Sequence, residues 1–259
     1  WMGLLGKAMN LGAIFSSNSI SFPQINPPLQ PEQQIQIGQW LSGIAASAMK
    51  NTFGTADYFS YMAVGMMSFV VMFTTMFSGM SIVWDRRLGF LNKVLSTPVA
   101  RGSILMAKIF SAVIRALVQA TIVLVIAYAL GLSVGPDFTL LNLIGVYAAL
   151  FLISMGLSSI FILIAIRSTR QETQMAVVNL LNLPLMFASN ALFPAKLMPD
   201  WLQTITKINP VTYATDATRQ LILYTIDMHQ LGIDFLFLGA FAVISSTIGI
   251  LLSWRYLSK

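Results

Sequence analysis

Residue types that usually carry enzymatic chemistry are scarce in this chain of 259 residues. It has no cysteine, which excludes disulfides, thiol chemistry and cysteine-bound metals, and its single histidine is His229. Ser158 would need a histidine base at the same depth to act as a nucleophile, and His229 falls in a predicted loop. A lone histidine also cannot build a metal site by itself. We therefore predict neither catalytic residues nor a metal site.

Charged side chains gather in short segments, and the most informative is residues 84–103, which read WDRRLGFLNKVLSTPVARGS. Its leucines Leu88, Leu91 and Leu95 recur at helical spacing, so we predict a short amphipathic helix bounded by a glycine and a proline. A helix of this kind beneath a membrane can carry force from a soluble partner into the two spans beside it.

A basic stripe follows this segment. Arg101, Lys108 and Arg115 stand seven residues apart and so share one helix face, which suits an anionic lipid headgroup or an acidic patch of a partner. The alternative is that the helix extends past the bilayer and its basic side chains reach back to the surface, and we favour this for Lys108. Arg115 lies deeper, where a charge usually has a partner.

Two other stripes are candidates for a substrate path. The first repeats at spacings of three and four residues and consists of Met66, Phe69, Phe73 and Met76. Flexible methionines suit a tolerant hydrophobic cavity, although helix packing explains the pattern about as well. The second is Asn179 and Asn182, which line a polar path or form an interhelical hydrogen bond, and we favour the bond.

The elements that must position these residues are membrane-spanning helices. Hydrophobic residues make up 56% of the chain and charged residues 9%, whereas a soluble domain carries about a quarter charged residues. Five runs of 20 or more residues hold no charge, which is the length that crosses a bilayer, and they lack the alternation of a membrane barrel. We predict one all-α transmembrane domain, residues 1–259, with six spans at about residues 1–15 (incomplete), 58–83, 104–131, 140–166, 174–193 and 235–254. A secretory signal peptide is the weaker reading of residues 1–15.

The basic residues are distributed asymmetrically about these spans. Ten of the 15 lysines and arginines fall in residues 84–115, residues 167–170 and the C-terminal segment. This positive-inside pattern predicts a multi-pass protein of the cell membrane with both termini and the segment 84–103 in the cytoplasm. Because the basic residues follow the topology, the net charge of +6 does not indicate that the protein binds nucleic acid.

Residues 16–57 and 194–234 are then outside. In the first region Pro31 can begin an interfacial amphipathic helix that carries Trp40 and Ile44 on one face.

In the second outer region prolines begin two shorter helices, which we expect either to form an outer lid over the pathway or to fill the outer leaflet. Asp216 and Arg219 can pair across one helical turn there. The residues assigned to the lid are Trp201, Asn209, Pro210, Tyr213, Asp216 and Arg219.

These patterns together resemble the ATP-binding-cassette type-2 permeases, the family that includes the daunorubicin-resistance exporters. In that family an acidic–basic pair precedes a glycine, a leucine-rich helix and a Thr-Pro or Ser-Pro. The matching residues are Asp85, Arg86, Gly89, Leu91, Leu95, Thr97 and Pro98. The stretches DYFSYMAVGMMSF and LFPAKLMPDWLQTITKINPVTYATDATRQLI also match in order and spacing. Two departures are Asp85 in place of the usual glutamate and Asn92-Lys93 where an acidic residue is common.

The resemblance implies a homodimer in the lipid membrane, joined to two cytoplasmic ATPase subunits that bind ATP and Mg, with no cofactor bound by this chain. No G-x-x-x-x-G-K phosphate loop occurs in the sequence, which also favours a separate ATPase. The residues we expect to dock the ATPase are Asp85, Arg86, Arg87, Leu88, Gly89, Leu91, Leu95, Thr97 and Pro98, with a second contact through Arg167, Arg170 and Glu172.

The implied function is export of an amphiphilic drug, lipid or glycan from the cytoplasm or inner leaflet. An ATP-independent carrier is the first alternative, and it needs buried ionisable residues, for which only Arg115 is a candidate. A membrane-embedded enzyme is the second, and the missing catalytic set disfavours it.

Overall fold

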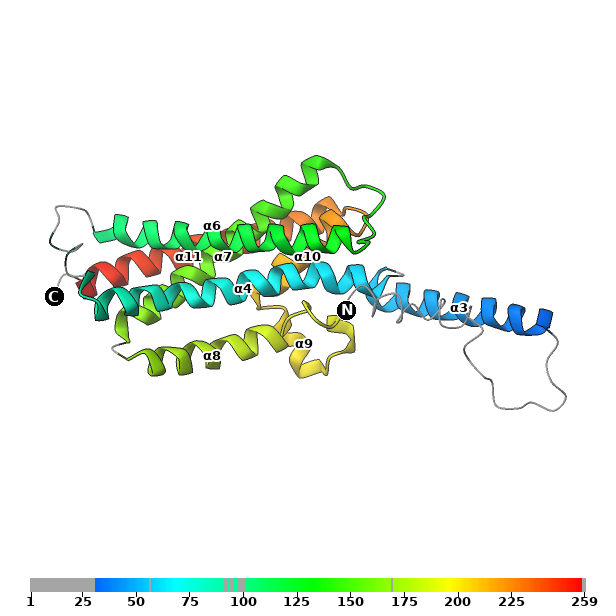
Figure 1. Ribbon diagram of the computed structural model, residues 1–259, viewed down its shortest axis with the longest axis horizontal. Helices are drawn as coiled ribbons and strands as arrows, with labels where there is room; N and C mark the ends of the chain where they lie inside the picture. The colour runs from blue at the N-terminus through cyan, green and yellow to red at the C-terminus, as the bar shows by residue number, and fades with distance from the viewer. Residues whose placement is uncertain are drawn as a thin grey trace.

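Four long helices form the body of the protein. The computed structural model describes residues 31–55, 57–90, 93, 96, 101–168 and 170–257. The long helices lie side by side along the long axis (Figure 1), with α7 packed against α4, α6 and α11. Their bounds are α4 (Tyr58–Arg87), α6 (Arg101–Ala129), α7 (Leu140–Arg167) and α11 (Met228–Leu257).

Each of these helices supplies a segment long and apolar enough to cross a membrane, and they are the four such helices in the part of the chain that the structure describes. The segments are Ala46–Arg87, which begins within α3 (Pro31–Phe53), Gly102–Ala129, Leu140–Arg167 and Met228–Leu252. They correspond to the second, third, fourth and sixth predicted spans. The incomplete first span, residues 1–15, lies outside the described residues.

The fifth predicted span is shorter than expected. It becomes α8 (Gln171–Phe187), whose 17 residues end six positions before residue 193. Pro184 stands in its last turn, and the chain leaves the helix at Ala188. At 1.5 Å per residue such a helix is about 25 Å long, just short of a bilayer core.

The sixth span is longer than expected and begins at Met228 rather than near residue 235. The Asp227 carboxylate accepts hydrogen bonds from the backbone N–H groups of His229 and Gln230, at 3.0 and 3.4 Å. These N–H groups have no partner within the helix, so Asp227 supports an early helix start.

The described parts of the two regions predicted to be outside are largely helical. α3 (Pro31–Phe53) begins at the predicted proline and extends beyond the bundle (Figure 1), with Trp40 and Ile44 exposed. α10 begins at Pro210 with Asn209 as its N-cap, as predicted, and packs against α4, α7 and α11. The bounds of the short helices in the second outer region are η1 (Ala195–Leu197), α9 (Asp200–Thr206) and α10 (Pro210–Ile222).

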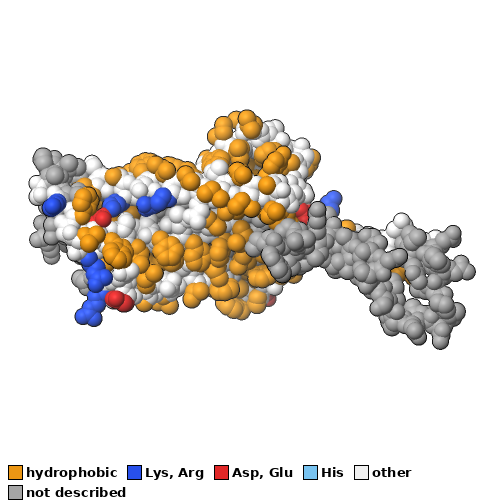
Figure 2. Space-filling view, in the orientation of Figure 1, with side chains coloured by type: hydrophobic (Ala, Val, Ile, Leu, Met, Phe, Trp, Pro, Cys, Tyr) orange, Lys and Arg blue, Asp and Glu red, His pale blue; other side chains and the backbone are white. Residues whose placement is uncertain are grey.

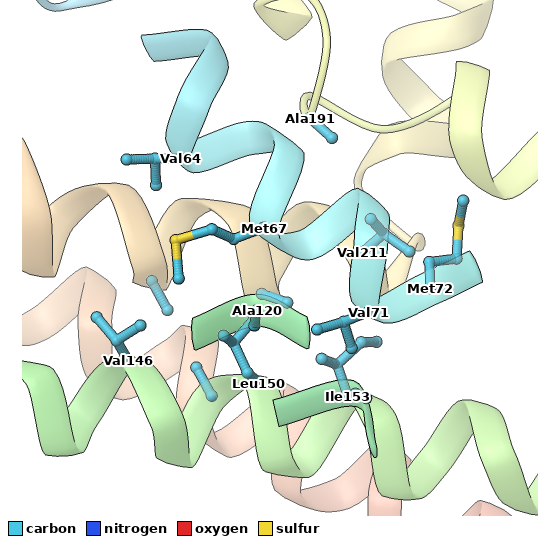
Figure 3. Packing of buried hydrophobic residues seen from close by; sticks show 14 of the residues in the cluster. Val64, Met67, Val71, Met72, Ala120, Val146, Leu150, Ile153, Ala191 and Val211 are labelled. Atoms are coloured by element: carbon cyan, nitrogen blue, oxygen red, sulfur yellow. The ribbon is translucent and has the colours of Figure 1, made fainter. Parts of the chain in front are cut away.

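The core lies where α4 crosses α7. Figure 3 shows Val64, Met67 and Val71 of α4 lying near Leu150 and Ile153 of α7 within one buried cluster. Toward the other end of α4, a Cβ added at Gly79 would stand 2.6 Å from the carbonyl oxygen of Phe161. Glycine therefore allows the two backbones to come this close.

The two ends of the bundle differ in charge. On the face shown in Figure 2, most lysine and arginine side chains lie toward the left end, and the middle is largely hydrophobic. α4, α7 and α11 end at this basic end, while α6 and α8 begin there (Figure 1).

Candidate functional site

Charged residues at the basic end bind to other helices of the bundle. Asp85, near the end of α4, forms an ion pair with Lys108 of α6. Arg86 donates to the carbonyl oxygens of Ile166 and Ser168, at 2.8 and 3.3 Å. These carbonyls belong to the end of α7, where the helix dipole is negative, so a guanidinium is well placed to cap it.

The segment assigned to ATPase docking therefore begins with Asp85 and Arg86, whose side chains bind α6 and the end of α7. Leu88 follows at the C-cap of α4 with 74% of its surface exposed, and Gly89 adopts a positive φ of 72° in the turn. The left-handed backbone at this turn suits glycine. Four other docking residues lie outside the described residues: Leu91, Leu95, Thr97 and Pro98.

The second cytoplasmic segment lies beside the first. Arg87 stands 3.5 Å from the Oε1 atom of Gln171, the first residue of α8, at the limit of a hydrogen bond. Arg167, Arg170 and Glu172 are exposed around this turn, and Glu172 occupies the first turn of α8, where an acidic residue complements the helix dipole. The end of α4 and the α7–α8 turn thus form one continuous surface.

A groove of about 420 Å³ runs between α4 and α6. It brings together four residues of the predicted substrate path, together with other side chains, most of them polar, that the sequence interpretation did not single out. The predicted residues are Met66, Phe69, Phe73 and Arg115, and the others include Thr74, Phe77, Ser78, Ser81 and Gln119.

The remaining predicted path residues lie elsewhere. Met76 is 4% exposed and belongs to the core. On α8, Asn179 is exposed whereas Asn182 is buried, so the two do not share an environment. The Oδ1 atom of Asn182 has no hydrogen-bond partner among the described residues, so the structure does not show the predicted interhelical bond at that atom.

The groove walls have distinct chemistry. The rings of Phe69 and Phe73 lie 4.6 Å apart between centroids. The Thr74 hydroxyl stands 2.6 Å from Oε1 of Gln119 and joins α4 to α6. Arg115 is exposed, and none of the described residues forms an ion pair with it.

Hydroxyl side chains of α4 bond back to their own helix along this wall. Thr74 donates to the carbonyl of Val70, one turn earlier, at 2.8 Å. Three more residues do the same toward carbonyls three positions earlier, namely Thr75, Ser78 and Ser81. For Thr75, Ser78 and Ser81 these bonds satisfy the hydroxyl donor within α4, whereas the single Thr74 hydrogen is shared between the Val70 carbonyl and Oε1 of Gln119.

At the opposite end, a buried arginine joins the outer segments to the bundle. Arg219 of α10 is 2% exposed and donates to the carbonyl oxygens of Asn190 and Ala191, at 2.7 and 2.8 Å. Its guanidinium carbon lies 3.6 Å from the centre of the Tyr61 ring, an arrangement that favours a cation. Gly65 makes room for it, because an added Cβ would lie 2.0 Å from the Ala191 carbonyl oxygen.

The predicted pairing of Asp216 with Arg219 is wrong. Asp216 instead accepts a hydrogen bond from the side-chain amide of Asn190, while Arg219 binds backbone carbonyls. Burial raises the pKa of the Asp216 carboxyl, and the Arg219 charge and the Asn190 amide oppose that change. Both side chains therefore bind the 189–191 turn rather than each other, since that turn presents both a carbonyl and an amide to α10.

Other lid residues differ in exposure. Trp201 of α9 is 67% exposed. Tyr213 donates to the Lys207 carbonyl at 2.6 Å and stacks on Phe237 of α11, 4.0 Å away. The two helices thus differ, because α10 is fixed to the bundle and α9 lies at the surface.

Tyr61, Asn190 and Asp234 contribute to polar clusters that the sequence interpretation missed. Asp234 is fully buried and accepts from the side-chain amides of Gln220 and Gln230, at 3.1 and 3.0 Å. The spacing of four residues between Gln230 and Asp234 could have indicated their hydrogen bond from the sequence, because such residues are neighbours on a helix surface. The link to Gln220 crosses between helices and carries no local signal.

Comparisons with known proteins agree with this architecture. A family model described as ABC-2 type transporter matches residues 34–223. A putative transport permease, ycf38, from Cyanophora paradoxa is 33% identical over 166 residues, which cover 64% of this chain and 56% of the relative.

Two bacterial relatives are also similar. The probable multidrug ABC transporter permease YbhR of Escherichia coli is 31% identical over 161 residues, covering 60% of this chain and 42% of the relative. The daunorubicin resistance ABC transporter permease protein DrrB1 of Streptomyces coeruleorubidus is 24% identical over 179 residues, or 69% of this chain and 62% of the relative. The chain thus spans less than two thirds of the length of each of these relatives.

Proposed function

The chain belongs to the ABC-2 type transporter family, and from this premise we propose that it is the membrane-spanning subunit of an ATP-driven exporter. In this proposal a separate cytoplasmic ATPase binds ATP and Mg and docks at the basic end of the bundle. The complex contains two copies of each subunit in the cell membrane, with both permease termini in the cytoplasm. Its substrate is an amphiphilic drug, lipid or glycan taken from the cytoplasm or inner leaflet.

The observation that carries the proposal is the attachment of Arg86 to the end of α7. It joins the end of α4 to the α7–α8 turn, so that a partner bound there contacts two helices at once. A displacement of that partner would then move both helices together. The name of the YbhR relative, an ABC transporter permease, supports an ATPase partner for this chain as well.

Copurification tests the proposal. An affinity-tagged chain expressed with its chromosomal neighbours should recover an ATPase subunit in equal amounts. Leu88→Asp should reduce that recovery, because Leu88 belongs to the expected docking residues and is 74% exposed. Leu197→Asp is the matched control, since Leu197 is 60% exposed on η1 at the opposite end. Absence of any ATPase from the wild-type preparation would contradict the proposal. Unchanged recovery with Leu88→Asp would show that the ATPase docks elsewhere on the protein.

An ATP-independent carrier is the second candidate, and one observation favours it. Asp234 is a fully buried carboxylate whose described partners are two neutral amides, and such a group can exchange a proton during transport. Transport driven by an imposed pH gradient and abolished in Asp234→Asn would establish this candidate. ATP-dependent transport that survives Asp234→Asn would exclude proton coupling at this residue.

A further inference from the structure

The groove between α4 and α6 is ordered along the long axis of the bundle. α4 runs toward the basic end, so its groove residues Ser78 and Ser81 lie nearer that end, and Met66 and Phe69 lie farther from it (Figure 1). The hydroxyl-bearing part of the groove therefore points toward the basic end, and the apolar part points away from it. An amphiphile seated in the inner leaflet has the same orientation, with its headgroup toward the cytoplasm.

Arg115 lies at the middle of the candidate membrane span of α6, Gly102–Ala129. It follows Lys108 by seven residues on α6, which is a rise of about 10 Å toward the other end of the bundle. Its neighbours Ile114 and Val118 are more than half exposed, as residues facing lipid are. Lys108 is paired with Asp85, whereas Arg115 has no acidic partner in the described parts of the chain. A guanidinium at this depth is costly without an anion beside it.

The remaining lining fits an elongated apolar body. The volume of about 420 Å³ falls within the range of about 300–1,000 Å³ typical of small-molecule sites. Phe69 and Phe73 form a paired aromatic wall, and Phe77 is half exposed at the groove edge. A ligand can thus reach the groove sideways from the bilayer, and Gln119, one turn from Arg115, supplies a second polar group beside the guanidinium.

We propose that this groove binds an anionic amphiphile drawn from the inner leaflet. A carboxylate or phosphate headgroup binds Arg115 and Gln119, and the apolar body lies along Phe73, Phe69 and Met66. This inference rests on the proposed export function and names its substrate class.

Head-group selectivity tests the proposal. The purified protein, reconstituted in phosphatidylcholine nanodiscs without nucleotide, is titrated with three fluorescent dodecyl probes that carry a carboxylate, a phosphate monoester or a trimethylammonium head. The two anionic probes should bind at least about tenfold more tightly than the cationic probe. Arg115→Gln should remove that preference, and Arg115→Lys should restore most of it.

Two further variants separate charge from packing. Phe73→Ala should weaken all three probes alike, because it shortens the apolar wall. Lys207→Gln removes a charge from an exposed site at the outer helices and should change none of the affinities. Equal affinity for the three heads in the wild type, or unchanged selectivity in Arg115→Gln, would overturn the proposal.

Adding phosphatidylglycerol to the nanodiscs identifies the source of the anion. If it displaces the anionic probes, the groove holds a bilayer phospholipid; if it does not, the groove prefers a free amphiphile. Failure here is also separable from failure of the export function. An ATPase-bound complex that transports without Arg115-dependent binding rejects only this inference, while Arg115-dependent binding by a chain that recovers no ATPase rejects only the ATPase partner.

Discussion

Arg219 shows at the residue scale how a charge is held inside this protein. It is almost fully buried, yet its guanidinium meets two backbone carbonyls and the face of an aromatic ring. These contacts replace the water that the charge loses on burial. The side chain thereby connects α10, the 189–191 turn and the start of α4.

Arg219→Ala should destabilise the protein by about 3 kcal/mol, because it leaves the buried carbonyls of Asn190 and Ala191 without their donor. Equilibrium unfolding in mixed micelles measures the change. Arg170→Ala removes an exposed arginine and should alter stability by less than about 0.5 kcal/mol. Equal stability of the two variants would mean that the Arg219 contacts contribute nothing net.

At the element scale, close backbone contact decides how α4 and α7 pack. An added methyl group at Gly79 meets the Phe161 carbonyl, which belongs to the backbone of α7 and cannot rotate away. A Cβ added at Gly239 on α11 would meet no heavy atom within 4 Å among the described residues beyond its own stretch of helix. The two glycines thus provide a matched comparison.

Gly79→Ala should lower stability by about 1–3 kcal/mol, because the helices must separate to admit the methyl group. Gly239→Ala should be neutral or stabilising by up to about 1 kcal/mol, since alanine favours the helix. Thermal unfolding in detergent distinguishes these signs. A stable Gly79→Ala variant would show that the crossing relaxes without cost.

The outer helices differ in exposure, and we expect only α9, the exposed one, to shift during transport. Trp201→Cys on α9 should react with a water-soluble maleimide at different rates in nucleotide-free and ATP-trapped complexes. Ala217→Cys on the buried face of α10 should stay unlabelled in both states. The chain has no native cysteine, so each signal comes from one site. Identical Trp201→Cys labelling in both states would make α9 passive structure.

Helix identity and the position of four spans could be predicted from sequence, because charge-free runs of sufficient length have few alternatives in a membrane. Asn209 and Pro210 also marked the start of α10 correctly, since capping depends on local residues. Partners across helices could not be predicted in this way. Arg219 was assigned to Asp216 by spacing alone, and its true partners at positions 190 and 191 come from a distant turn.

The groove illustrates the same limit. The spacing of Met66, Phe69 and Phe73 gave the correct face of α4, because helical periodicity is local. Met76 fits that spacing and yet lies in the core, since its position depends on where α7 crosses. That these residues lie in the same groove as Arg115 could not be predicted, because it depends on how α6 packs on α4.

At the scale of the whole molecule, most lysines and arginines on the face in Figure 2 lie toward one end of the bundle, and the groove opens sideways between two helices. A sideways groove can receive a substrate from lipid but does not enclose a passage across the membrane by itself. Such a passage needs additional helices, and a second copy would supply them.

We expect a homodimer for this reason. Native mass spectrometry in mild detergent should detect two permease copies, in the presence and absence of the ATPase. A monomer that binds the ATPase and transports substrate would contradict this expectation.

The hydroxyl side chains of α4 have a mechanical consequence. Those that bond back to their own helix do so between Val70 and Ser81, and bonds of this kind make a helix easier to bend. α4 contains no proline, so its curvature need not be fixed at one angle. We therefore expect the wall of the groove that α4 forms to bend more easily than a helix without such bonds. When such a wall bends, the width of the groove changes with the thickness of the bound ligand. A single groove can then accept amphiphiles whose apolar bodies differ in cross-section.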